Sequence, residues 1–241
     1  MKKTRIIAIV LVVALMAMGA GYAAWSEQIT INTTATTGQL KVEFVQEDNW
    51  LVDYPDLGVF DNKLSKPDYL TGGIVHGPKV TTVTVNKMYP GSTVVFDLKA
   101  ENLGSIPAKF DYADVRPAAG ASQLLMDNVL VYGEIMHMRP GRILPVAIYN
   151  IALPVINNPV TISTLEARLN TILAGLELKV GDYLVFDATD EYKAELESVI
   201  GVNDSEQASC IFLHLPMSAG NDVESQAAQF DIEFNFKQFN K

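Results

Sequence analysis

Apolar and polar residues alternate with a period of two in short segments along most of the chain, and the pattern is clearest at 228–239. There Phe230, Ile232, Phe234 and Phe236 are separated by polar side chains. Successive side chains of a strand point to opposite faces, so this segment predicts a β-strand with one buried face. Comparable patterns predict strands at 40–44, 79–86, 92–101, 107–115, 128–138, 142–153 and 209–217. Many short strands separated by Pro and Gly turns predict a mainly β fold, a jelly-roll-like antiparallel sandwich.

Helical periodicity interrupts the alternation between residues 160 and 203. Ser163 and Glu166 have the spacing of a capping box, and the leucines from 165 to 176 fall on one stripe. A second amphipathic stretch at 189–201 ends at Gly201, and 179–186 between the two has the composition of a strand. We expect a small, mostly helical insertion, about 160–203, packed on the side or end of the β domain.

The first 23 residues have the three parts of a secretory signal peptide. A basic start at residues 1–5 precedes an apolar run from Ile6 to Gly19, and Gly21 and Ala23 supply small residues before a cleavage site. The run is shorter than the roughly 20 apolar residues of a membrane span. We therefore predict cleavage between Ala23 and Ala24 and secretion of the mature chain, with an uncleaved signal anchor as the alternative.

Charge and cysteine content restrict the function of the mature chain. The formal charge is −10, and loss of the three basic residues of the leader makes it −13. An acidic surface repels phosphates, so a nucleic-acid partner is not expected. The single cysteine, Cys210, cannot form an intrachain disulfide, so stability must come from the hydrophobic core.

Cleavage at Ala24 would leave a strand-like segment at the new terminus. In an extended chain Trp25, Ile29 and Ile31 lie on one face, and Gly38 then ends the run. Two interpretations remain open for residues 24–38: an edge strand of the molecule's own sheet, or a strand donated to the sheet of a neighbouring copy.

Four features of the sequence together resemble the TasA/camelysin family. They are the leader with "AAWSE" at the cleavage site, "TATTGQLKV" after it, "NKMYPGSTVVFDLKAENLGSIPAKF" at 86–110, and the C-terminal "FDIEFNF" strand. The resemblance covers about 1–45, 86–115 and 209–240. It implies a secreted jelly roll at 39–241, processed by a dedicated signal peptidase. The N-terminal strand, with Trp25, Ile29 and Ile31 as its donor face, would complete the next subunit of an extracellular, biofilm-matrix homopolymer. An accessory fibre protein is a further implied partner.

Residues 46–78 lengthen the connection before the 86–110 motif beyond the family pattern. Five acidic residues crowd its first half: Glu47, Asp48, Asp53, Asp56 and Asp61. Such oxygen ligands suit Ca²⁺, but the EF-hand spacing is absent, so we interpret the segment as a solvated acidic loop.

Two rival function classes remain beside the fibre. One is a monomeric cell-surface accessory or adhesion protein. The other is a camelysin-like metalloprotease, for which zinc would need His76, His137 and His214 to converge, because no His-Glu-x-x-His motif is present. We expect no catalytic residues, no metal site and no cofactor. His137 and His214 then belong to strands and His76 to a turn.

Overall fold

The computed structural model describes residues 2–23, 37–45, 51–53, 71–96, 98–153, 159–200, 211–223 and 226–239. The chain divides into two units, Met1–Thr37 and Gly38–Lys241. In the first unit, helix α1 (Lys2–Ala23) covers the predicted leader. No helix among the described residues is long and apolar enough to cross a membrane.

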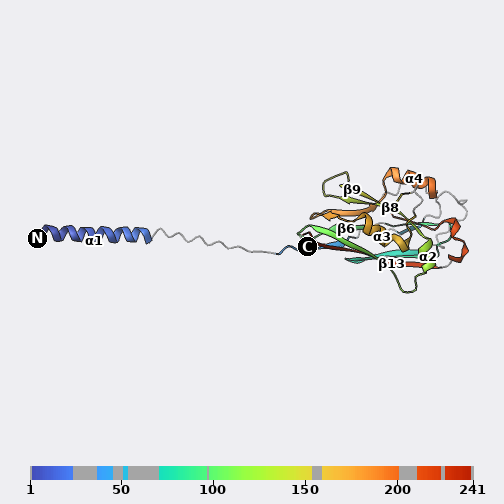
Figure 1. Ribbon diagram of the computed structural model, residues 1–241, viewed down its shortest axis with the longest axis horizontal. Helices are drawn as coiled ribbons and strands as arrows, with labels where there is room; N and C mark the ends of the chain where they lie inside the picture. Colours follow the sequence, from blue (N-terminus) through green and yellow to red (C-terminus); the bar gives the residue numbers. More distant parts are fainter. Residues whose placement is uncertain are drawn as a thin grey trace. The chain divides into compact units, whose positions relative to one another are not determined.

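The second unit is built from two antiparallel sheets, which carry the core between them (Figure 1). The eight-stranded sheet has the order β1-β6-β11-β8-β12-β5-β2, with β9 also paired to β8. Its strands are β1 (Val42–Phe44), β2 (Leu51–Asp53), β5 (Thr93–Phe96), β6 (Leu98–Asn102), β8 (Leu130–Met138), β9 (Ala147–Ala152), β11 (Tyr183–Asp187) and β12 (Ile211–His214). The five-stranded sheet has the order β10-β7-β13-β4-β3. Its strands are β3 (Thr71–His76), β4 (Val80–Asn86), β7 (Ala108–Pro117), β10 (Glu177–Leu178) and β13 (Ala227–Gln238).

Alternating burial along the strands produces the core of the sandwich. Every second residue of β4 is buried, and the same is true of β13 from Ala228 to Phe234. The ring of Phe234 on β13 stacks on that of Phe186 on β11, with centroids 5.6 Å apart. Phe44 approaches the same ring at 5.5 Å, so aromatic contacts connect the two sheets. The described core residues all lie within Gly38–Lys241, so this unit is expected to fold without residues 1–37.

The predicted fold class, a mainly β antiparallel sandwich, is confirmed. The strand predicted at 228–239 is β13 and that at 79–86 is β4, each within a residue or two. The predicted strand 92–101 is two strands, β5 and β6, with Asp97 outside the described residues. The strand predicted at 142–153 begins only at Ala147, because residues 139–146 form the exposed turn of the β8–β9 hairpin.

The interpretation of 46–78 as a loop is wrong for part of the segment. Asp53 ends β2, which pairs with β5, and residues 71–76 form β3, which pairs with β4 along its whole length. The other four acidic residues of that segment lie outside the described residues. Backbone pairing with a neighbouring strand has therefore overridden a local composition that favours a loop.

Three helices accompany the described strands of the second unit: α2 (Gln123–Asn128), α3 (Ile162–Ile172) and α4 (Asp190–Ile200). The predicted helices correspond to α3 and α4, whereas α2 was not predicted. The capping box predicted at Ser163 and Glu166 is wrong: α3 is capped at Thr161, whose backbone N–H donates to Thr164 Oγ1 at 2.9 Å. The strand between the helices, β11, lies inside the eight-stranded sheet between β6 and β8.

A tyrosine from α4 supplies hydrogen bonds at an irregularity in the pairing of β8 with β9. The register shifts after Gly133, and Tyr192, only 4% exposed, places its hydroxyl there. The hydroxyl accepts from the N–H of Gly133 at 2.8 Å and donates to the carbonyl of Ala152 at 2.5 Å. Burial raises the pKa of Tyr192, so the hydroxyl stays protonated and able to donate. Tyr192 therefore supplies the hydrogen bonds that the bulge removes from the ladder.

We expect Tyr192→Phe to lower the free energy of unfolding by about 2 to 6 kcal/mol, because two buried backbone groups lose their partner at about 1–3 kcal/mol each. Urea denaturation of the variant measures the loss. Tyr112→Phe, at a tyrosine that is 49% exposed on β7, is the matched control and should change stability little. Equal stability of both variants would contradict the role given to Tyr192.

Candidate strand-docking edges

The edges of the two sheets are the candidate functional site, because an edge strand presents unpaired N–H and C=O groups to any incoming strand. In the five-stranded sheet the outer strands are β3 and the very short β10, which covers only the start of β7. In the eight-stranded sheet they are β1 and β2, with β9 forming a further edge beside β8. These edges differ in how their backbone groups are satisfied.

Helix α3 closes the part of β7 that β10 leaves uncovered. The side-chain amide of Asn170 accepts from the N–H of Ala113 at 2.7 Å and donates to its carbonyl at 2.8 Å. Two residues further along β7, Val115 donates its N–H to Glu166 Oε2 at 3.1 Å. The side chains of α3 therefore take the positions that a neighbouring strand would occupy.

The same helix also satisfies the edge of β9 in the other sheet. Arg168 donates from Nε to the carbonyl of Ile151 at 2.7 Å and from Nη2 to that of Asn150 at 2.8 Å. The apolar side of α3, with Leu165 and Leu169, faces the core. Figure 1 shows α3 between the strands β8 and β9 and the strand β13. One helix thus occupies part of an outer strand in each sheet, at 113–115 of β7 and at 150–151 of β9.

Strand β3 shows no comparable protection among the described residues. It pairs with β4, and no described strand pairs with its other side. Gly77 and Val80 form a hydrogen-bonded pair at the turn, so the alternation of an antiparallel ladder directs the backbone groups of residues 72, 74 and 76 outward. The strand contains neither lysine nor proline, the residues that commonly guard edges.

The side chains of β3 leave space beside its edge. Val75 is 69% exposed on the outer face, and an added Cβ at Gly73 would meet nothing within 4 Å. Ile74 is buried on the inner face and anchors the strand to the core. The strand is therefore held in place by Ile74, and among the described residues no strand pairs with its outer edge.

Strand β1 is a shorter and partly closed edge. The N–H of Phe44 donates to the carbonyl of Pro78 at 3.0 Å, which joins β1 to the β3–β4 turn. A shallow crevice lies beside this contact and is lined in part by Val42, Phe44 and Lys79. It encloses no space for a small-molecule ligand, whose sites typically measure roughly 300–1,000 Å³. A strand meeting β1 would find one of its outward groups already used.

Most of the site residues predicted from the sequence cannot be placed against these edges. Trp25, Ile29, Ile31 and Ala24 lie outside the described residues, as does Cys210. Ala23 is the last residue of α1, so the predicted cleavage follows directly on the helix. Donation of the strand and cleavage of the leader both stay predictions.

The three histidines do not converge, which argues against the zinc alternative. His137 and His214 lie on the neighbouring strands β8 and β12, but His214 is opposite Leu130, seven residues from His137 and hence roughly 23 Å along the strand. His76 ends β3 in the other sheet, so its assignment to a turn is wrong by a position. The described residues contain no group of three His, Cys, Asp or Glu able to hold a metal ion.

His137 has a structural partner at the end of β8. His137 Nε2 lies 2.9 Å from Asp182 Oδ2, and Arg139 Nε donates to the other carboxylate oxygen at 3.0 Å. Burial by itself raises the pKa of Asp182, but hydrogen bonds from Arg139, His137 and the N–H of Lys179 outweigh it and hold the pKa below its ordinary value. The ionised Asp182, 1% exposed, therefore fixes the β10–β11 turn to the end of β8.

The residues that close the edges were missed by the sequence analysis. Glu166 was assigned to a helix cap, and neither Arg168 nor Asn170 was singled out. The sequence contains a weak signal for these residues: Glu166 and Asn170 lie four residues apart, on one polar strip beside the apolar stripe of α3.

The chain matches no protein-family model, no curated protein and no solved structure.

We expect Asn170→Ala to lower the free energy of unfolding by about 1 to 3 kcal/mol and to expose one turn of the β7 edge, because the N–H and C=O of Ala113 lose their partner. Hydrogen exchange followed by mass spectrometry should show faster exchange at Ala113. Thr171→Ala is the control, since that hydroxyl is exposed and bonds only within α3, to Ala167. Unchanged exchange at Ala113 in the Asn170 variant would contradict the closure of this edge.

His214 gives the fold a specific pH dependence. Burial lowers the pKa of His214 to about 4, while the unfolded chain keeps the ordinary 6.5. Between these values the unfolded state binds a proton that the native state does not, so stability falls as pH drops from about 6.5 to 4, by up to about 3 kcal/mol. Above pH 6.5 the contribution is constant.

Denaturation at several pH values, comparing wild type with His214→Gln, measures this effect. The variant should lose less stability than wild type between pH 6.5 and 4, whatever its stability at pH 7. Parallel curves would show that His214 is not held neutral by its site against Thr93.

Proposed function

We propose that the chain is a secreted structural protein of the TasA/camelysin type, which assembles into extracellular fibres by donating residues 24–38 to the sheet of the next copy. The observation that carries the proposal is the contrast between edges. Helix α3 closes β7 and β9 with side-chain hydrogen bonds, whereas β3 has no described partner beyond β4. The donated strand would present Trp25, Ile29 and Ile31 to the acceptor.

Energetics favour a docked apolar face over backbone pairing alone. The three outward residues of β3 offer six backbone groups, worth about 6 kcal/mol at about 1 kcal/mol for each hydrogen bond. Association costs roughly 4–15 kcal/mol, so backbone pairing covers at most the lower end of that range. Burying the three donor side chains at about 1.5–3 kcal/mol each would raise the total to about 10–15 kcal/mol, which exceeds most of that range.

Strand donation would connect different surfaces on donor and acceptor. Such a heterologous contact repeats without closing on itself and produces a filament. Cleavage at Ala24 by a dedicated signal peptidase would release the strand for pairing, and an accessory fibre protein with a similar strand would start or end a filament. The proposal requires no cofactor and no catalytic residue.

We expect a chain starting at Ala24 to form fibres and a chain starting at Gln39 to remain unpolymerised, because only the first carries the donor strand. Negative-stain electron microscopy of the two proteins at equal concentration makes the comparison. Fibres of equal abundance from both chains would remove the donor role. A persistent monomer of the longer chain would favour an accessory or adhesion protein.

A second variant tests the acceptor edge in the chain that starts at Ala24. Val75→Lys places a charge at the edge of β3 and should reduce fibre mass at least about tenfold, as edge lysines oppose strand pairing. Met217→Lys, at a similarly exposed position, is the control and should leave fibre mass unchanged. If both variants form fibres as abundantly as the parent chain, the acceptor edge lies elsewhere.

A further inference from the structure

The outer face of the eight-stranded sheet is apolar where β11, β8 and β9 lie side by side. Val185 is opposite Met136, which is opposite Ile148, and Tyr183 is opposite Met138 in the next row. Their neighbours Leu184, Phe186 and Ile135 are buried in the core, so these five side chains point outward. We call them the β8 face. Ile148 is 42% exposed and the other four are half-buried, and a partly exposed apolar sheet face of this kind is typical of an interaction surface.

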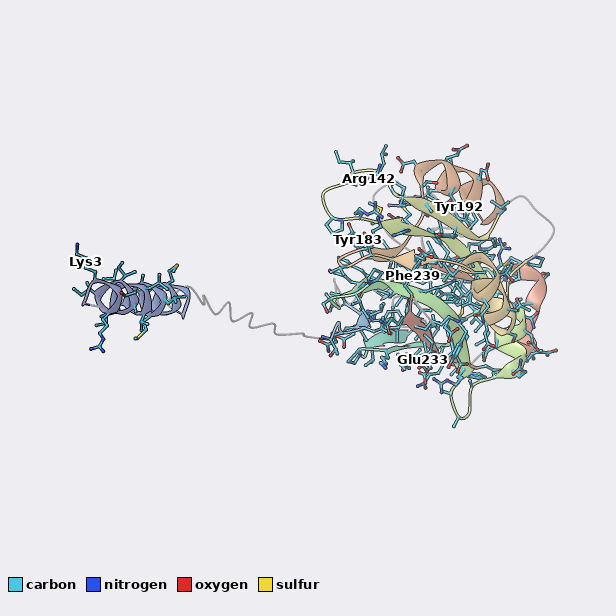
Figure 2. All side chains as sticks on the ribbon, turned by 60° about the vertical axis from the view of Figure 1, so that its left-hand side comes forward. Lys3, Arg142, Tyr183, Tyr192, Glu233 and Phe239 are labelled. Carbon is cyan, nitrogen blue, oxygen red and sulfur yellow. The ribbon has the colours of Figure 1, made fainter. Side chains whose placement is uncertain are left out.

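The β8 face continues into the turn of the β8–β9 hairpin. Ile143 is 95% exposed and Leu144 is 73% exposed, values that few large apolar residues reach in a folded domain. Figure 2 shows Arg142 at the outer tip of this hairpin. Residues 135–149 contain two arginines and no acidic residue, although the chain as a whole has 28 acidic residues against 18 lysines and arginines.

The charges at the two ends of the β8 face have opposite sign. At the hairpin end lie the exposed Arg142 and Lys179, together with Arg139, which neutralises Asp182. The β10–β11 turn belongs to this end, because a Cβ at Gly181 would lie 3.4 Å from the ring of Pro140. On β6, Lys99 and Glu101 flank the apolar rows with opposite charges, and Lys99 Nζ lies 4.6 Å from the centre of the Tyr183 ring.

The opposite end is acidic. Asp187 is opposite Glu134 at the end of the paired region, and α4 begins there with the exposed Asp190 and Glu191. Lys193 is the cation of α4 in this region. Figures 1 and 2 agree in placing the β8–β9 hairpin and α4 at opposite ends of the same outer layer.

We propose that the β8 face is a self-complementary interface on which a second copy of this chain docks by a two-fold axis. An axis through the middle of the face, near Met136 and Val185, sets apolar rows against apolar rows. It also brings the basic hairpin of each copy to the acidic start of α4 in its partner. In a two-fold interface each contact occurs twice, so the charge pattern is satisfied at both ends. This contact is independent of strand donation and would join filaments side by side.

The test uses sedimentation velocity on the chain starting at Gly38, which keeps the whole core and lacks the donor strand. We expect a concentration-dependent dimer that weakens at high salt, because screening removes the charge pairing. Arg142→Glu and Glu191→Lys should each weaken the dimer at least about tenfold, and Ile148→Thr should do so through the apolar rows. Lys79→Glu makes the same charge change on the other sheet and should have no effect.

The double variant Arg142→Glu with Glu191→Lys separates pairing from general damage, since exchanging the charges should restore the dimer to within about threefold of wild type. A wild-type chain that stays monomeric to about 100 µM would overturn the proposal. So would a monomer that sediments with phosphatidylserine vesicles and loses this binding in Arg142→Glu, since that result assigns the face to a membrane. Fibres formed by the chain starting at Ala24 with Arg142→Glu would leave strand donation intact.

Discussion

The structure depends on how the backbone groups at the ends and edges of its strands find hydrogen-bond partners. A buried N–H or C=O without a partner costs about 1–3 kcal/mol, so each irregularity of the two sheets needs a specific side chain. Asn170 and Arg168 meet this need at β7 and β9, and Tyr192 meets it at the bulge between β8 and β9. Asn102 does the same for two turns, donating to the carbonyls of Ile106 and Leu178 at 3.0 and 3.1 Å. For β3 the described residues include no side chain of another element that performs this task, and β1 is met there only by the backbone carbonyl of Pro78.

The sequence predicted those parts of the fold in which side-chain alternation coincides with burial. β13 and β4 follow the pattern closely, because one face of each packs on the core and the other meets water. β3 escaped the same analysis since "TGGIVH" has two glycines, which contribute no side chain to the pattern. Its strand conformation comes from pairing with β4, a partner that local sequence does not reveal.

The edge-closing residues show a second limit of sequence analysis. Glu166 has the spacing of a helix cap relative to Ser163, yet its carboxylate accepts from Val115 and Ser163 donates to Asp127 instead. The spacing predicts a local hydrogen bond for each of these side chains, but each bonds instead to a residue distant in the sequence. Sheet order decides which partners are near, and neither composition nor periodicity specifies that order. The predicted donor segment, by contrast, rests on the family resemblance and on the alternation of its side chains.

The order of the strands also bears on when the molecule can fold. β13 is the last strand of the chain and lies in the middle of the five-stranded sheet, between β7 and β4. β11 likewise comes late in the chain and separates β6 from β8. Neither sheet can be completed before its late strand has been synthesised, so the finished sandwich forms only after β13 has emerged. Under the proposed secretion, a translocation channel would receive most of the chain before the sandwich is complete.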